Sequence, residues 1–251
     1  MTDRTPLTGR TAVVTGASRG IGLAVAERLA TDGANVIGVA RSVDALQECA
    51  DRVRAVGREF TPVAAALESR PDLYSAIDAI RPMHADIVVH AAGINRRAPA
   101  VDHGDQLWDE VIAVNLTAPF ILTRELGREM VAKGSGNIVF VASMLSYQGG
   151  VTVPGYAASK GGVAQLTKAF ANEWAGRGVN VNAIAPGYVN TDMNEALLAD
   201  TERHLQISQR IPAARWGSPD EMAGAVAFLA SDDARYVHGT IVNVDGGWLA
   251  R

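Results

Sequence analysis

The sequence predicts a doubly wound α/β fold, in which a parallel sheet of seven strands carries helices on both faces. Short runs rich in Val and Ile alternate with longer segments of helical spacing, and most of these runs lack polar alternation. Strands that are buried on both faces have this pattern. Repeated β–α units connect in a right-handed way and build such a sheet. A chain of 251 residues suits one domain of this kind, spanning residues 1–251.

The elements follow one another in a regular order. The expected strands are Thr11–Thr15, Asn35–Ala40, Asp86–Ala91, Asn137–Ala142, Val179–Ala185 and Thr240–Val244, with Phe60–Leu67 as a weaker seventh. The expected helices are Gly20–Thr31, Val43–Val56, Asp72–Ile80, Asp105–Lys133, Gly155–Gly176 and Pro219–Ser231. The amphipathic helical segment Asp192–Arg210 breaks this order, because it stands where a loop after a strand is expected. We interpret residues 190–213 as a lid over a substrate site.

Composition and charge exclude several classes of function. The net charge is −4, whereas dedicated nucleic-acid binders are usually basic. No apolar run reaches the roughly 18 residues of a membrane span, and the polar segment Met1–Arg10 is unlike a secretory signal. Cys49 is the single cysteine, which excludes an intrachain disulfide and disfavours a cysteine-based metal site. We therefore expect a cytoplasmic protein with no metal, nucleic-acid or membrane partner.

A glycine-rich segment directly follows the first expected strand. Thr15–Gly22 has the spacing G-x-x-x-G-x-G and leads into a helix. Glycines there permit a tight turn and a close approach of the backbone to a pyrophosphate, and the helix N-terminus attracts anions. A glycine-rich turn without a ligand is the alternative. The residues expected to contact a dinucleotide are Gly16, Ser18, Arg19, Gly20, Ile21 and Gly22.

The end of the second strand bears on the choice between NAD and NADP. An acidic residue there would select NAD by accepting hydrogen bonds from the ribose 2′-hydroxyl. Arg41 and Ser42 occupy this place instead. Arg41 and Arg19 can flank a 2′-phosphate, so we expect NADP rather than NAD. Two solvated arginines are the alternative.

A serine, a tyrosine and a lysine form the expected catalytic group. Tyr156 and Lys160 are four residues apart and therefore share one face of a helix. A nearby ammonium stabilises a phenolate and lowers its pKa, which makes Tyr156 a usable general acid–base. Ser143 follows a strand, at the edge of the sheet where ligands bind in such folds, and can hold a carbonyl oxygen. A Tyr–Lys pair alone also occurs on exposed helices.

Over essentially its whole length the sequence resembles the short-chain dehydrogenase/reductase family. The matching segments are Thr15–Gly22, Ala92-Gly93, Val114–Leu116, Ser143, Tyr156 with Lys160, and Pro186–Thr191. The resemblance implies a Ser143–Tyr156–Lys160 triad extended by Asn115, which bends its helix and positions a water on a proton relay. It also implies that Lys160 holds the nicotinamide ribose. The further cofactor contacts that it implies are Leu67, Ala92, Gly93, Pro186, Gly187, Val189 and Thr191.

Two positions depart from the family pattern. His90 and Ala91 replace the first two residues of the usual Asn-Asn-Ala-Gly segment. We interpret His90 as structural, so it must replace the hydrogen bonds of an asparagine or leave a gap. Ala66 stands where the family often has an acidic residue near the adenine, which leaves that contact to the backbone or weakens it.

Within the family, the C-terminal half resembles the sugar-acid members, the 2-dehydro-3-deoxy-D-gluconate 5-dehydrogenases, also called 2-deoxy-D-gluconate 3-dehydrogenases. The similar stretches are Gly93–Arg97, Ala142–Gly150, Val153-Pro154, Ala171–Ala175, Asn182–Tyr188, Arg210–Gly217 and Asp245–Arg251. The resemblance implies interconversion of a secondary alcohol and a ketone on a sugar acid, with NAD rather than NADP as the usual cofactor.

A sugar acid needs a cation for its carboxylate and polar groups for its hydroxyls. Arg96 and Arg97 follow the fourth expected strand and can grip a carboxylate with paired hydrogen bonds, although a surface or subunit contact is an equal alternative. The other expected substrate contacts are Leu145, Gln148, Tyr188 and Asn190.

The remaining predictions concern assembly and the competing functions. The two long helices are Asp105–Lys133 and Gly155–Gly176. In the family these helices form the dimer interface and tetramers are common, so we expect a homotetramer. Trp248 is expected in a subunit interface. A β-ketoacyl-(acyl carrier protein) reductase or broad ketone reductase is the alternative enzyme. A non-catalytic nucleotide-binding regulator is the alternative of another class.

Overall fold

The computed structural model describes residues 5–251. All seven strands form one parallel sheet, in the order β3-β2-β1-β4-β5-β6-β7. The strands are β1 (Thr11–Thr15), β2 (Asn35–Ala40), β3 (Phe60–Ala64), β4 (Ile87–His90), β5 (Gly136–Val141), β6 (Val179–Pro186) and β7 (Ile241–Val244). The predicted fold class is confirmed. The weaker candidate Phe60–Leu67 forms β3, which pairs along its whole length with β2. Strands β1 to β3 are added toward one edge of the sheet, and β4 then lies on the other side of β1. Ligands bind at such a switch point in open parallel sheets.

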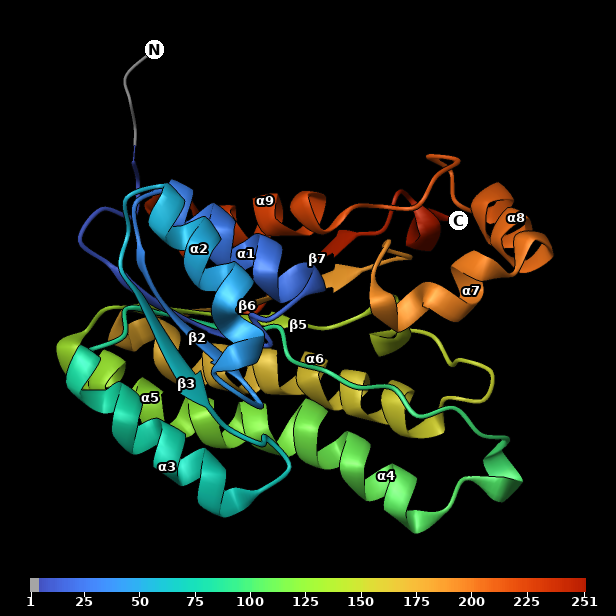
Figure 1. Cartoon of the computed structure of the whole chain (residues 1–251), viewed down its shortest axis with the longest axis horizontal. Helices are drawn as coiled ribbons and strands as arrows, with labels where there is room; N and C mark the ends of the chain where they lie inside the picture. The colour runs from blue at the N-terminus through green and yellow to red at the C-terminus, as the bar shows by residue number, and fades with distance from the viewer. Residues whose placement is uncertain (1–4) are drawn as a thin grey trace.

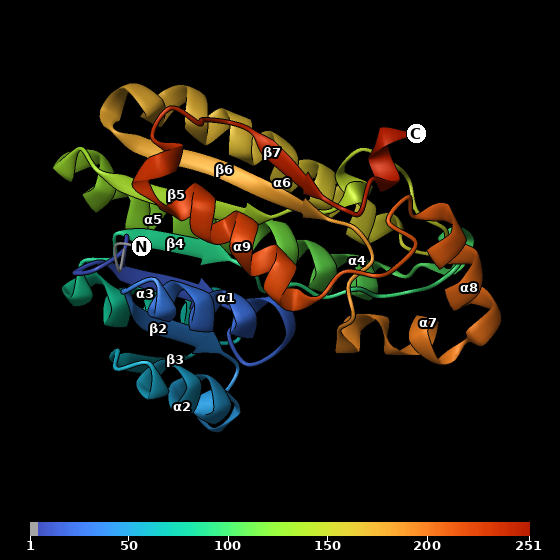
Figure 2. The same cartoon turned by 90° about the horizontal axis from the view of Figure 1, so that it is seen from above.

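Helices cover both faces of the sheet, as the two perpendicular views show (Figures 1 and 2). The layer on one face consists of α1 (Gly20–Thr31), α2 (Gln47–Ala55) and α9 (Pro219–Ala230). The other layer consists of α3 (Arg70–Ile80), α4 (Asp105–Ile112), α5 (Ala118–Lys133) and α6 (Pro154–Trp174). Strands buried on both faces explain why the Val- and Ile-rich runs show no polar alternation.

The long helix predicted over Asp105–Lys133 is interrupted. A turn of π-helix, Ala113–Thr117, joins α4 to α5. Asn115 stands in the middle of this turn and is 1% exposed. Single π-turns inside α-helices are rare and frequent at functional sites. Apolar spacing in this region fits an ordinary helix and does not predict the interruption; only the family resemblance implied that the helix bends at Asn115.

The segment that breaks the β–α alternation lies beyond the carboxyl ends of the strands (Figure 1). It contains α7 (Glu195–Ala199) and α8 (Thr201–Arg210). Ile207 of α8 packs into a small cluster of buried residues that is separate from the two faces of the sheet. That cluster also contains Met144, Ile211, Trp216 and Trp248. Trp248, which we expected in a subunit interface, is 6% exposed already within its own chain.

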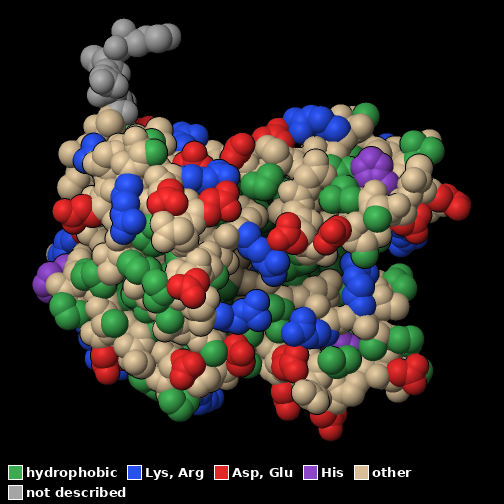
Figure 3. All heavy atoms as spheres, in the orientation of Figure 1, with side chains coloured by type: hydrophobic (Ala, Val, Ile, Leu, Met, Phe, Trp, Pro, Cys, Tyr) green, Lys and Arg blue, Asp and Glu red, His purple; other side chains and the backbone are tan. Residues whose placement is uncertain are grey.

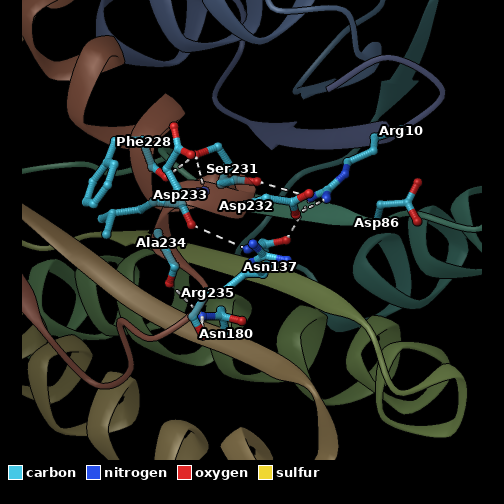
Figure 4. Close-up of polar contacts among 12 residues, drawn as sticks. Arg10, Asp86, Asn137, Asn180, Phe228, Ser231, Asp232, Asp233, Ala234 and Arg235 are labelled. Atoms are coloured by element: carbon cyan, nitrogen blue, oxygen red, sulfur yellow. Dashed lines mark hydrogen bonds and ion pairs between the residues drawn. The ribbon is translucent and has the colours of Figure 1, made fainter. Parts of the chain in front are cut away.

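A polar network ties the opposite, amino edge of the sheet together (Figure 4). The Arg10 guanidinium donates to the Asn137 side chain at 3.2 Å and to the Ala230 carbonyl at 3.3 Å, and it pairs with Asp232. Asn180 donates to the Ala234 carbonyl at 3.0 Å. These bonds join the start of β1, the strands β5 and β6 and the end of α9. Within residues 5–251, no helix is both long enough and apolar enough to cross a membrane.

Candidate active site

The glycine loop lies between β1 and α1, and two of its glycines leave no room for a side chain. Gly16 has a φ of +70°, and a Cβ there would lie 2.7 Å from the Ala92 Cα. A Cβ on Gly22 would lie 2.1 Å from the Gly16 carbonyl oxygen. Gly16 therefore lets the loop pack against the segment after β4, and Gly22 lets the first turn of α1 pack against the loop.

The N-terminus of α1 is open to an anion. Among residues 5–251 no side chain caps it, and its first turn contains no acidic residue. The unpaired N–H groups and the positive end of the helix dipole therefore face the loop without a protein partner. The pyrophosphate of a dinucleotide fits this open helix N-terminus, which supports the predicted dinucleotide site.

A first cavity of about 550 Å³ runs from this loop to the catalytic residues. In the space-filling view a hollow crosses this face, and basic side chains gather along it (Figure 3). The predicted cofactor contacts line the cavity; they are Gly16, Ser18, Arg19, Gly20, Ile21, Gly22, Arg41, Leu67, Ala92, Gly93, Tyr156, Lys160, Pro186, Gly187, Val189 and Thr191. The cavity and the open helix N-terminus together fit a dinucleotide.

Both arginines proposed for a 2′-phosphate line this cavity. Arg41 is exposed at the end of β2. Arg19 pairs with Asp192 at 3.1 Å, and both side chains are more than 60% exposed, at 69% and 63%. Exposed ion pairs contribute little to stability, so a phosphate can displace Asp192 from Arg19 at small cost.

Ser143 begins a short turn directly after β5. Its Oγ accepts a hydrogen bond from the Leu145 N–H at 3.1 Å, and the Ser146 hydroxyl accepts from the Ser143 N–H at 3.3 Å. Ser146 in turn donates to the Lys160 carbonyl at 2.8 Å. Because the Ser143 oxygen accepts from the backbone, its own proton is available for a substrate oxygen.

Tyr156 and Lys160 lie on adjacent turns of α6. The Lys160 Nζ lies 5.5 Å from the centre of the Tyr156 ring and donates to the Val141 carbonyl at 2.7 Å. Desolvation lowers the pKa of Lys160 to about 8. Desolvation also raises the pKa of Tyr156, with the Ser143 side chain acting in the opposite direction. The expected lowering of the Tyr156 pKa is not met here, because burial is the largest cause of its shift.

Asn115 braces the site from the π-turn. Its side-chain oxygen accepts from the Ile94 N–H at 2.8 Å, and its amide donates to the Ile94 carbonyl at 2.9 Å and to Ser159 at 3.1 Å. The loop after β4 is thus tied to α6. Gly93 lies beside both groups, since a Cβ there would be 3.5 Å from the Asn115 oxygen and 3.7 Å from the Lys160 Nζ.

His90 is a structural residue in this fold. Its Nε2 lies 2.8 Å from the Thr123 hydroxyl of α5, and its ring stacks on Phe140 with the ring centres 4.8 Å apart. Burial lowers the pKa of His90 to about 3, so the ring is neutral. The contact with Thr123 supplies one hydrogen bond, and the Nδ1 atom has no partner in the described chain.

A second cavity of about 390 Å³ meets the first one. Five residues line both cavities; they are Ser143, Tyr156, Gly187, Met193 and Asn194. A group in the second cavity can therefore reach the serine and tyrosine hydroxyls while a dinucleotide occupies the first. This arrangement suits a reaction between a cofactor and a small substrate.

The predicted substrate residues are only partly brought together. Arg97, Leu145, Gln148 and Tyr188 line the second cavity. Arg96 lines the first cavity instead, and its Nε is paired with Glu110 at 2.9 Å. Asn190 lines neither cavity, because its backbone N–H bonds to the Gly217 carbonyl at 2.9 Å in the bridge between Val189 and Gly217, and its side chain is exposed.

Sequence reasoning missed the polar residues that α8 contributes. Arg203, Gln206 and Arg210 line the second cavity. Their spacing of three and four residues places them on one face of a helix. That spacing was visible in the amphipathic segment, but its direction toward the catalytic residues depends on the fold.

Comparisons with known proteins agree with this geometry. The family model for short chain dehydrogenases matches residues 10–202. The chain belongs to the short-chain dehydrogenase/reductase family. It is thus an NAD(P)-dependent oxidoreductase that acts on CH–OH groups.

Individual relatives cover the whole chain. The 2-dehydro-3-deoxy-D-gluconate 5-dehydrogenase of Pseudoalteromonas atlantica is 52% identical over 100% of both chains. A solved structure from Beutenbergia cavernae, provisionally identified as an NAD(P)-dependent gluconate 5-dehydrogenase and holding NADP at low occupancy, is 49% identical with a TM-score of 0.96, over 99% of this chain and 100% of that one. A structure from Agrobacterium tumefaciens with bound NADP, provisionally a 2-deoxy-D-gluconate 3-dehydrogenase, is 48% identical with a TM-score of 0.93, at the same coverage.

Proposed function

We propose that this short-chain dehydrogenase interconverts a secondary alcohol and a ketone on a sugar acid such as 2-deoxy-D-gluconate or 2-dehydro-3-deoxy-D-gluconate, with NADP as the preferred cofactor. One observation carries the proposal: the second cavity reaches Ser143 and Tyr156 and is lined by three arginines, with no Asp or Glu among its lining residues. An anionic, hydroxylated substrate fits such a cavity. The relatives named for this class of substrate support it.

The roles of the residues follow from their geometry. A nicotinamide cofactor held by the residues of the first cavity would supply or accept the hydride. Tyr156 gives its phenolic proton to the carbonyl oxygen during reduction and takes it back during oxidation. The Ser143 hydroxyl donates to the same oxygen and holds it in place. Lys160, fixed on the Val141 carbonyl, offers a cation beside the tyrosine.

The segment from residue 190 to 213 acts in this proposal as a lid on a single-domain enzyme spanning residues 1–251. Met193 and Asn194 line both cavities, and Leu197 lines the second one. Closure of such a segment would exclude water from the hydride-transfer step.

A homotetramer and a cytoplasmic location belong to the same proposal. Trp108 of α4 and Phe120 of α5 are 41% and 38% exposed, on the helices expected at a dimer interface. Large exposed apolar side chains on neighbouring helices suit a subunit contact. Sedimentation velocity of the purified protein checks the assembly: a mass near four chains is expected, and a monomer would contradict it.

Formation of reduced nicotinamide tests the function. The purified protein is offered NAD or NADP with 2-deoxy-D-gluconate, D-gluconate or a hydrophobic secondary alcohol. Turnover of a sugar acid, faster with NADP, is expected. Turnover of the hydrophobic alcohol alone would reject the sugar-acid assignment and favour a ketoacyl or broad ketone reductase.

Arg41→Asp tests the cofactor preference. The carboxylate would repel the 2′-phosphate and accept hydrogen bonds from a ribose 2′-hydroxyl. We expect kcat/KM for NADP to fall by about tenfold or more, with NAD unaffected or improved. An unchanged preference would overturn the NADP assignment.

A further inference from the structure

One face of α8 points hydrogen-bond donors toward the second cavity. Arg203, Gln206 and Arg210 all line it, together with the apolar Ile207. Ile207 is buried in the cluster around Trp216 and Trp248, which fixes the rotation of the helix. The other face of α8 is exposed at Leu205, so the basic residues are on the cavity side.

The two arginines of α8 have no carboxylate partner within residues 5–251, unlike Arg96 on the other side of the active site. Gln206 is engaged, since its amide donates to Glu202 at 3.1 Å. Guanidinium groups that line a cavity without an acidic neighbour attract an anion, and their planar fork matches a carboxylate.

Arg210 is held in place by the C-terminal residues. Its guanidinium carbon lies 4.1 Å from the centre of the Trp248 ring, within the range of a cation–π contact. Trp248 donates through Nε1 to Gln148 at 3.1 Å, and Gln148 also lines the cavity. The Arg251 guanidinium donates to the Gln209 carbonyl at 3.3 Å and to the Arg210 carbonyl. The last residues of the chain therefore secure the end of α8.

Preorganisation favours Arg210 as a ligand. An arginine side chain normally loses much rotamer freedom when it binds an anion. Stacking on Trp248 removes part of that freedom before the substrate arrives. The contact with the ring uses none of the guanidinium N–H groups in a hydrogen bond to oxygen, so these groups stay available to an anion.

We infer that Arg203 and Arg210 of α8 bind the carboxylate of the substrate, and that Trp248 positions Arg210 for this contact. The inference rests on the proposed function and refines it, because it assigns acid recognition to α8 rather than to Arg96. The enzyme then distinguishes a sugar acid from its uncharged analogue through α8.

Two substrates of similar shape that differ in charge test the assignment. Arg203→Gln and Arg210→Gln are assayed with 2-deoxy-D-gluconate and with its primary amide, which keeps the hydroxyls and removes the charge. We expect KM for the acid to rise by about tenfold or more in each variant, with kcat/KM for the amide within about twofold of wild type. Arg54 is an exposed arginine of α2 that lines neither cavity. Arg54→Gln is therefore the matched control, and its KM and kcat/KM should equal those of the wild type with both substrates.

A double-mutant cycle tests the role of Trp248. Trp248→Leu removes the stacking partner and should raise KM for the acid more than it lowers kcat. Combined with Arg210→Gln, it should add little further loss, because both changes disable the same contact. Trp248→Phe keeps an aromatic face and should restore most of the acid preference. Full additivity of the two losses would overturn the positioning role.

The outcomes distinguish failure of the proposed function from failure of the assignment to α8. NADP binding, followed by fluorescence titration, shows that each variant is folded. If the wild type turns over no sugar acid, the proposed function fails and this inference fails with it. If the wild type prefers the acid to the amide and both arginine variants retain that preference, only the assignment to α8 is overturned. Equal losses on acid and amide would also overturn it, since they indicate a structural role.

Discussion

Desolvation moves the pKa values of Tyr156 and Lys160 in opposite directions. The pKa of the tyrosine is raised, and the pKa of the lysine is lowered to about 8. At neutral pH the tyrosine therefore carries its proton and is ready to act as an acid on a ketone. Oxidation of an alcohol requires the deprotonated form.

The direction of the reaction should consequently depend on pH. We expect kcat/KM for alcohol oxidation to rise from pH 6 into the alkaline range, because the phenolate becomes available there. Ketone reduction should be fastest near neutrality, where Tyr156 keeps its proton, and should decline above about pH 8, where the charge of Lys160 is lost. Initial rates in both directions across this range provide the measurement, and a flat oxidation profile would exclude Tyr156 as the titrating base.

Tyr156→Phe isolates the proton-transfer step. The ring and its packing remain, while the hydroxyl is lost, so kcat should fall by roughly 10²–10⁴-fold and NADP binding should persist. Tyr236→Phe is the matched control, since Tyr236 is 99% exposed and lines neither cavity. Residual turnover close to wild type would show that another group carries the proton.

At the scale of elements, the glycine loop and the π-turn at Asn115 shape the site from two sides. The loop brings β1 and α1 against the segment after β4, and the π-turn ties that segment to α6 through Ile94 and Ser159. The two cavities meet between them. The glycine loop and the π-turn both depend on close packing of the backbone, so even a small added side chain should lower stability.

Gly22→Ala tests this packing. Its Cβ would lie 2.1 Å from the Gly16 carbonyl oxygen, and the backbone must move to admit it. We expect a loss of about 1–3 kcal/mol in the free energy of unfolding and weaker NADP binding. Gly224→Ala in α9 is the control, because its nearest neighbour would be the Arg28 Nη1 at 3.9 Å. Equal stability and NADP affinity in the two variants would contradict the account.

At the scale of the whole molecule, the two edges of the sheet have different tasks. The carboxyl edge carries both cavities, and the amino edge carries the network around Arg10, Asn137 and Asp232. The network joins parts of the chain that are more than a hundred residues apart, such as Arg10 and Asn137. It should therefore contribute to stability without affecting the chemistry.

Arg10→Met examines this division. The carbonyl of Ala230 and the side chain of Asn137 would lose a charged donor. We expect the free energy of unfolding in urea to fall by about 1–3 kcal/mol, with kcat/KM within about twofold of wild type. Arg54→Met on α2 is the comparison and should leave both unchanged. A selective loss of activity in Arg10→Met would reject the separation of the two edges.

The sequence by itself determined the α/β class, the seven strands, the glycine loop and the spacing of Ser143, Tyr156 and Lys160. Each of these is written in local periodicity or in a short contiguous motif, because backbone geometry repeats every two or 3.6 residues. The placement of the candidate cofactor residues along one wall followed from the rule that ligands bind at the carboxyl edge of a parallel sheet.

Tertiary structure decided what lies opposite those residues. The pairing of Arg96 with Glu110, the outward position of Asn190 and the burial of Trp248 against its own chain could not be read from neighbouring letters. The same holds for the π-turn at Asn115 and for the direction of Arg203 and Arg210 toward the cavity. These features depend on which side chains from distant segments share a space, and only the packed fold determines that.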